Sequence, residues 1–288
     1  MKEVGLKNVA QRSNFECNWK VISLIKIGAP HEYLACLFRG NEDGWVRMRI
    51  ILTWALFFLS MTGALPAQSD SFAMRRALQR YTEVYGGGRD ADALTSISIE
   101  GTQEIGGEVY DFLLRKKRPN SLRYRISREG QSVVTAYDGI SGWMQIQKDG
   151  ELTTRKLTRD ERIVLKEEAI FEGPLFRHLE SRRHQVEMTG LSRVEGRDAF
   201  VFQTREASGR RSIYYLDTRQ PHVLKVERLG ADDKVVMTTH YRDYRDVNDY
   251  PIAFEVETLV DGEVVSLVKV DSVTPNPGLL SFYFRMPE

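Results

Sequence analysis

The sequence contains little cysteine, and all of it lies near the start. Its two cysteines are Cys17 and Cys36, and none follows among the remaining residues up to 288. This excludes disulfide bonds, thiolate metal sites and cysteine nucleophiles from most of the chain. It also leaves no cysteine after residue 67 that could accept a lipid, so we expect no lipid anchor on a protein processed near that point.

An excess of one charge is also missing. The chain has 41 basic and 40 acidic residues, and 8 and 5 of these precede residue 68, which leaves a net charge of −2 for residues 68–288. A nucleic-acid-binding domain needs a concentrated basic face. We therefore expect no nucleic acid among the partners.

The patterns that mark common active sites are absent as well. After residue 67 the histidines are His178, His184, His222 and His240, and no two stand four residues apart as zinc ligands on a helix do. No Gly-x-Ser-x-Gly elbow occurs. We predict that the protein is not an enzyme and has no catalytic residue, metal or cofactor.

One apolar run is present, and it is short. Met48 and Arg49 precede the mostly apolar residues 50–59, and small residues follow up to Ala67. A membrane-spanning helix needs about 20 apolar residues, whereas this order is that of a secretory signal peptide. We predict a signal peptide at residues 48–67, cleaved after Ala64 or Ala67, and a non-native or disordered leader at residues 1–47. A retained signal anchor and a buried core helix are the alternatives.

The rest of the chain, residues 68–288, reads as one domain. Residues 69–85 have helical spacing, and three glycines follow. From Thr95 onward apolar and polar residues alternate with a period of two, and turn pairs such as Asp149-Gly150 and Asp261-Gly262 recur at short intervals. The pattern predicts an α+β fold, mostly antiparallel β.

Residues 158–181 interrupt the strands. Thr158 and Glu161 form a capping-box pattern at the start of a helix, and Gly173-Pro174 separates it from a second short helix. The segment is apolar, so it must lie on an apolar surface, for which the concave face of the sheet is the obvious partner. The helices either complete a dry core or enclose a space that holds a ligand.

Three local signatures carry a family resemblance. Arg118-Pro119-Asn120 ends a strand, Asp138-Gly139 precedes Trp143 by four residues, and Phe282-Tyr283-Phe284 with Pro287 finishes the sequence. In this order, around a helical insert, they resemble the periplasmic lipoprotein carrier and outer-membrane lipoprotein-sorting superfamily, as a divergent member. The resemblance implies an incomplete, unclosed β-barrel with a helical lid, at about residues 158–181, over an apolar cavity for acyl chains.

The resemblance also implies a site. Arg118 occupies the position of the arginine that, in the family, hydrogen-bonds to the lid when the site is empty. Alternation places Arg118 on the face of Tyr110, Phe112 and Leu114, where Lys116 departs from the apolar pattern. The candidate cavity and lid residues are Arg118, Tyr110, Phe112, Leu114, Trp143, Ile163, Ile170, Phe171, Leu175 and Phe176.

These expectations combine into a functional hypothesis. We expect a soluble periplasmic carrier that binds acyl chains of lipoproteins or lipids and shuttles them towards the outer membrane. Its partners would be an inner-membrane donor complex and an outer-membrane acceptor. The alternative is an envelope sensor or regulatory lipid-binding domain with a protein partner.

Overall fold

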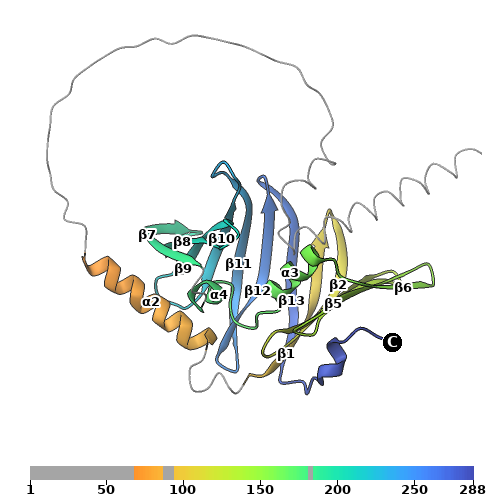
Figure 1. Cartoon of the computed structure of the whole chain (residues 1–288). Coiled ribbons are helices and arrows are strands. Elements are labelled where there is room, and N and C mark those ends of the chain that lie inside the picture. Colours follow the sequence, from red (N-terminus) through yellow and green to blue (C-terminus); the bar gives the residue numbers. More distant parts are fainter. Residues whose placement is uncertain (1–67, 87–93, 181–183) are drawn as a thin grey trace, which may run out of the picture.

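The fold is one bent sheet with helices on its inner side (Figure 1). The computed structural model describes residues 68–86, 94–180 and 184–288. The predicted signal peptide and leader therefore lie outside the described residues. The described helices are α2 (Gln68–Gly86), α3 (Arg159–Glu168), α4 (Phe176–Glu180) and the 3-10 helix η3 (Ser281–Phe284). The strands are β1 (Ser96–Ile105), β2 (Glu108–Lys117), β3 (Ser121–Arg128), β4 (Gln131–Tyr137), β5 (Gly142–Lys148), β6 (Glu151–Lys156), β7 (Gln185–Val194), β8 (Arg197–Arg205), β9 (Arg211–Asp217), β10 (Val223–Leu229), β11 (Val235–Val247), β12 (Tyr250–Val260) and β13 (Glu263–Pro275).

The thirteen strands form a single antiparallel sheet that does not close. Its order is β6-β5-β4-β3-β2-β1-β13-β12-β11-β10-β9-β8-β7, so β1 pairs with β13 and the two halves of the chain meet at the centre. Strands β6 and β7 are the edges, and within the described ranges they do not pair with each other. The prediction of an incomplete barrel with a helical lid is confirmed.

Register aligns apolar side chains on the inner face. Phe112 of β2 lies opposite Gly101 of β1 and Ile126 of β3. Gly101 leaves room for this ring, because a Cβ there would stand 2.9 Å from Phe112 Cε1 and 2.1 Å from the Lys269 carbonyl oxygen. A larger residue at position 101 would force the β1–β13 pair apart.

The buried core follows the inner face and divides by the helix that covers it. Leu165 of α3 and Ala169, which caps that helix, pack on the β1–β5 half, and the α2 side chains Met74, Ala77, Tyr81 and Tyr85 pack on the β8–β10 half. A third cluster, around Phe171, Ile252 and Phe254, joins them at the centre. The predicted helix at residues 69–85 is confirmed as α2. No helix in the described ranges combines the length and the apolar character that a membrane crossing needs.

The last residues of the sequence pack on the outer face. Phe284 of η3 is fully buried, and the Trp143 indole Nε1 donates to its carbonyl oxygen at 2.8 Å. Trp143 clusters there with Val134 and Ala136. Residues 276–288 thus form part of the fold and shield β4 and β5 from solvent.

We predict that Phe284→Ala destabilises the protein by about 3–5 kcal/mol, since it removes a fully buried ring. Its neighbour Phe282 is 66% exposed, so Phe282→Ala is the matched control and should shift the free energy of unfolding by no more than about 0.5 kcal/mol. Urea unfolding of both variants measures this. Equal losses would contradict the packing of this segment.

Candidate functional site

The candidate site is the inner face of the sheet together with the segment that crosses it, residues 158–180, which we call the lid segment. Figure 1 shows α3 lying over the β1–β5 half and α4 near α2 on the other half. Leu165 of α3 and Leu175 before α4 are both buried, in different clusters. The lid segment therefore spans the width of the concave face.

Arg118 at the end of β2 contacts the middle of the lid segment. Its Nη1 pairs with Glu172, its Nε donates to the Leu94 carbonyl oxygen at 3.0 Å, and its guanidinium carbon lies 4.6 Å from the Phe171 ring centroid. The Arg118 Nη2 atom is buried and has no hydrogen-bond partner among the described residues. Arg118 thus holds the lid segment by charge and stacking and keeps one donor unused.

Lys116, two residues before Arg118 on the same face of β2, also contacts the lid segment. Its ammonium group donates to the Ile170 carbonyl oxygen at 2.8 Å. Burial lowers the pKa of Lys116, and the nearby carboxylates of Glu168 and Glu172 oppose that shift. The lysine that departed from the apolar pattern of β2 is therefore a second point of attachment for the lid segment.

Tyrosines from two other elements bond to the lid backbone. Tyr250 OH donates to the Phe171 carbonyl oxygen at 2.7 Å, and the Leu175 N–H donates to Tyr81 OH at 3.1 Å. Gly173 lies against α2, because a Cβ there would stand 2.4 Å from Tyr81 OH and 3.0 Å from Tyr85 Cδ1. Burial raises the pKa of Tyr81 and of Tyr250, so both hydroxyls stay protonated.

An ion-pair cluster ties α3 to the opposite half of the sheet. Arg210, in the turn between β8 and β9, lies 2.5 Å from Glu167 of α3 and 2.6 Å from Glu206. Glu206 is buried. Since α3 packs on β1–β5, this cluster bridges the concavity and holds its two sides at a fixed separation.

Three residues of β2 that the sequence assigned to the site lie on the inner face of the sheet. Tyr110 and Phe112 are buried on the inner face, and Leu114 packs against the same cluster. Burial is the main cause that raises the pKa of Tyr110 to about 12, and its OH donates to Glu108 at 2.7 Å. These side chains form the floor beneath α3.

The lid residues divide between two clusters. Phe171 belongs to the central cluster, whereas Leu175 and Phe176 pack with α2 and β8–β10. Ile170 contributes its backbone carbonyl to Lys116. The structure thus brings Arg118, Ile170 and Phe171 together, but it places Leu175 and Phe176 in the cluster shared with α2.

Two predicted site residues do not face the concave side. Trp143 lies opposite Ala136 in register, on the outer face covered by Phe284. Ile163 is 47% exposed on α3. The expectation that these two side chains line a cavity is corrected, because the first is separated from the inner face by the sheet and the second points to solvent.

Sequence reasoning missed several contacts. Tyr81, Tyr250 and Arg210 each attach the lid segment, and Lys116 was noted only as a departure from the pattern. The helical spacing of the aromatic residues in α2 was the sequence signal that could have indicated a buried position for Tyr81. Nothing in the sequence indicates the partners of Arg210 or Tyr250, because they depend on strand register.

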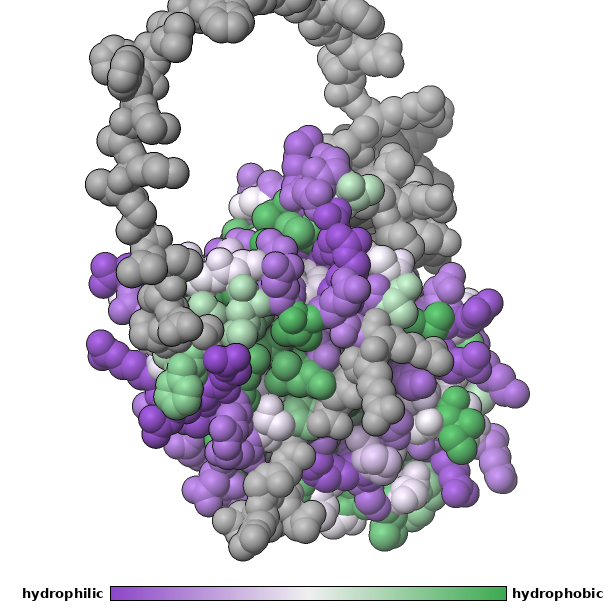
Figure 2. Space-filling model, turned by 60° about the vertical axis from the view of Figure 1, so that its left-hand side comes forward, coloured by the Kyte–Doolittle hydropathy of each residue, from purple (hydrophilic) through white to green (hydrophobic). Residues whose placement is uncertain are grey.

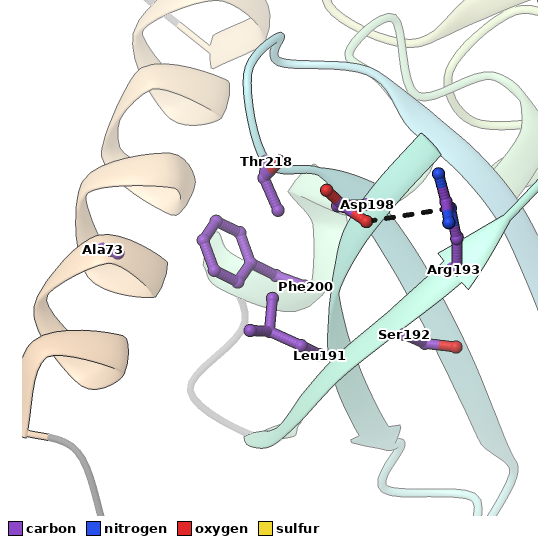
Figure 3. A pocket seen from close by; sticks show the side chains of 7 residues that line it. All are labelled: Ala73, Leu191, Ser192, Arg193, Asp198, Phe200 and Thr218. Carbon is purple, nitrogen blue, oxygen red and sulfur yellow. Dashed lines mark ion pairs between the residues drawn. The ribbon is translucent and has the colours of Figure 1, made fainter. Parts of the chain in front are cut away.

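An open pocket lies where the inner face meets α2 (Figure 3). It encloses about 500 Å³ and is lined by Ala73, Leu191, Ser192, Arg193, Asp198, Phe200 and Thr218. In Figure 3 the Phe200 and Leu191 side chains point towards α2, while Arg193 and Asp198, 4.0 Å apart, lie further along the strands. Figure 2 shows hydrophobic residues gathered on this side of the molecule between hydrophilic margins. The pocket is apolar at one end and charged at the other.

The side chains at the site are mostly apolar, with a few polar groups among them. No group of three or more His, Cys, Asp and Glu side chains in the described ranges is arranged to hold a metal ion. His178, the buried histidine nearest the lid segment, lies 2.9 Å from Tyr214 OH through its Nε2. The inner face offers apolar surface, tyrosine hydroxyls and cations, which suit an apolar ligand with a polar head.

The fold matches solved structures. No protein-family model matches the sequence, and the search of curated proteins finds no relative. A DUF1329 family protein from Desulfovibrio piger is 12% identical, with a TM-score of 0.53 over 75% of this chain and 97% of that one. A putative outer membrane lipoprotein-sorting protein domain from Vibrio parahaemolyticus is 12% identical, with a TM-score of 0.52 over 74% of this chain and 97% of that one. The resemblance drawn from the sequence is confirmed at the level of the fold.

We predict that Glu161 stabilises α3 in a pH-dependent way. The capping box is present: the Glu161 N–H donates to Thr158 Oγ1 at 3.3 Å, and the Thr158 N–H donates to Glu161 Oε2 at 2.8 Å. The hydrogen bond from Arg155 is the main cause that lowers the pKa of Glu161 from 4.5 to about 2. Because the folded pKa is the lower one, this stabilisation is present above about pH 5 and is lost as the pH falls towards 2.

Glu161→Gln should therefore lower the free energy of unfolding by about 0.5–1 kcal/mol at neutral pH, and the difference from wild type should shrink as the pH falls and vanish below about pH 2. Urea unfolding at a series of pH values measures it. Glu151→Gln, which removes an exposed carboxylate on β6, is the control. A difference that stays constant with pH would refute the role of the Glu161 charge.

Proposed function

We propose that the protein is an exported, soluble carrier that binds acyl chains of lipoproteins or lipids beneath the lid segment and carries them towards the outer membrane. In this role it would take cargo from an inner-membrane donor and deliver it to an outer-membrane acceptor. The observation that carries the proposal is the attachment of the lid segment, which covers an apolar face through buried side chains and a few polar contacts. The shared fold with a lipoprotein-sorting domain supports the proposal.

The magnitudes fit a carrier. Burying an acyl chain contributes about 0.8 kcal/mol per CH₂ group, so an apolar face alone supplies affinity. Each neutral hydrogen bond to the lid segment contributes about 0.5–1.5 kcal/mol net, and one to a charged group about 1.5–3 kcal/mol. A chain of a dozen or so CH₂ groups thus outweighs several of these polar contacts, so a ligand whose apolar surface also replaces that of Phe171 can displace the lid segment.

The proposed ligand contacts follow from the placement of the side chains. Apolar contacts would come from Tyr110, Phe112 and Leu114 below and from Ile170, Phe171, Leu175 and Phe176 above. When the lid segment moves, Arg118 and Lys116 lose their partners there. Lys116 then becomes a donor for an ester carbonyl, carboxylate or phosphate at the ligand head, whereas Arg118 acts on the empty state, in which it holds the lid segment closed. The open pocket beside α2 lies on the same inner face, where Phe200 belongs to the cluster of Leu175 and Phe176.

We predict that the protein purified from the periplasm carries acyl-chain material, detected by native mass spectrometry, and that it binds fluorescent fatty acids. Leu114→Ala should weaken that binding roughly threefold to tenfold, since it removes apolar contact area. Val109→Ala is the matched control, because Val109 is 54% exposed on the same strand. A protein that holds no lipid and binds no fatty acid would refute the proposal.

We also predict that Arg118→Leu slows release of a bound fatty acid, because removing the contacts with Glu172 and Phe171 destabilises the closed, empty state. Glu172→Gln should slow release by a similar factor, and the double variant should add little. Stopped-flow displacement measures the rates. Arg205→Leu, which removes an exposed arginine of β8, is the control. Unchanged release in both Arg118→Leu and Glu172→Gln would remove this ion pair from the mechanism.

A further inference from the structure

Residues 276–288 expose apolar side chains on the outside of the fold. Phe282 is 66% exposed, Leu280 61% and Met286 37%. In Figure 1 this segment projects beyond the sheet next to the labelled end of the chain. Ile140, in the turn between β4 and β5, is 85% exposed at the same end of the strands. Scattered apolar residues are ordinary on a surface, but a gathering of large ones marks an interaction site.

The exposed side chains are held in place by their neighbours. Tyr283 lies between two guanidinium groups, 4.8 Å from Arg115 and 4.3 Å from Arg123. Phe284 is buried against Trp143. On the other side of Phe282, the Lys117 ammonium donates to the Leu279 carbonyl oxygen at 2.7 Å. Phe282 therefore cannot turn inward without breaking contacts on both sides.

Cations surround this segment without carboxylate partners. Arg115 and Arg123 are opposite each other in register, and Arg125 follows on the same face of β3. Together with Lys117 and Arg285, they make no ion pair with a carboxylate among the described residues. The Asp138 carboxylate nearby accepts hydrogen bonds from Ile140 and Ser141 of its own turn. We call these five cations with Leu280, Phe282 and Met286 the outer surface.

We infer that the outer surface binds to membranes that contain anionic lipid. Apolar side chains that enter the headgroup layer beside cations are the combination that holds a protein at such a membrane. The apolar groups stand on a 3-10 helix and its flanks, beside cations whose charge complements an anionic surface. This inference does not depend on the proposed carrier function, since no ligand under the lid segment is required.

Vesicle flotation of the purified protein tests the inference, with vesicles of phosphatidylcholine alone or mixed with phosphatidylglycerol. Wild type should bind the mixed vesicles and lose that binding at high salt. Phe282→Ser/Leu280→Ser should weaken binding roughly tenfold or more. The matched control is Val264→Ser, because Val264 is 56% exposed at the opposite end of the strands. All variants carry the same N-terminal residues, so their differences report the outer surface alone.

Two double variants, each of which removes two positive charges, complete the test. Arg125→Gln/Arg285→Gln should weaken binding to mixed vesicles severalfold, whereas Arg76→Gln/Lys234→Gln, which removes the same net charge elsewhere, should not. Fatty-acid binding in solution should stay unchanged in every variant, which separates this test from that of the carrier function. Equal flotation of the outer-surface variants and their controls would overturn the inference. So would size-exclusion data showing that Phe282→Ser/Leu280→Ser dissolves a dimer, since the surface would then bind a second copy.

Discussion

The structure depends on one constraint: a bent sheet of thirteen strands that is largely apolar on its inner face must be covered. Closing the sheet would bury that face, but β6 and β7 remain unpaired edges within the described ranges. Helix α2 covers one half through Tyr81 and Tyr85, and α3 covers the other through Leu165. The stretch between them relies on Phe171 and on polar bonds to the backbone. Between the two helices the cover therefore rests on one buried ring and on polar contacts from Arg118, Lys116, Tyr250 and Tyr81.

The sequence was sufficient to predict the helices and strands, and to predict which side chains of β2 face inward. Period-two alternation, glycine turns and the capping box at Thr158 depend on local physics, so the strands, hairpins and α3 could be predicted. It was not sufficient for β5, in which Trp143 and Met144 are adjacent and both buried. Such a pair does not say which side chain faces inward. Trp143 is buried on the outer face of the sheet only because Phe284, far along the chain, packs on it.

The contacts of the lid segment were beyond prediction for a related reason. Glu167, Glu172 and Arg210 have the ordinary appearance of solvated surface charges in the sequence. Their pairing requires the correct register of every strand between β2 and β9, and an error of one residue in any strand would move its side chains to the other face. Arg118 was placed by alternation and family resemblance together. The partner Glu172 emerged only from the folded chain.

The end of β2 joins the two surfaces through opposite faces of one strand. Arg118 points to the lid segment, and Lys117, on the other face, bonds to residues 279 and 281. The Arg118 N–H donates to the Thr95 carbonyl oxygen at 2.9 Å, and Asn276 Oδ1 accepts from the Thr95 N–H at 2.8 Å. A force that displaces residues 276–288 therefore acts, through two hydrogen bonds, on the backbone that positions Arg118. Residues 276–288 and the residue that holds the lid segment are thus joined by two hydrogen bonds at the end of β2.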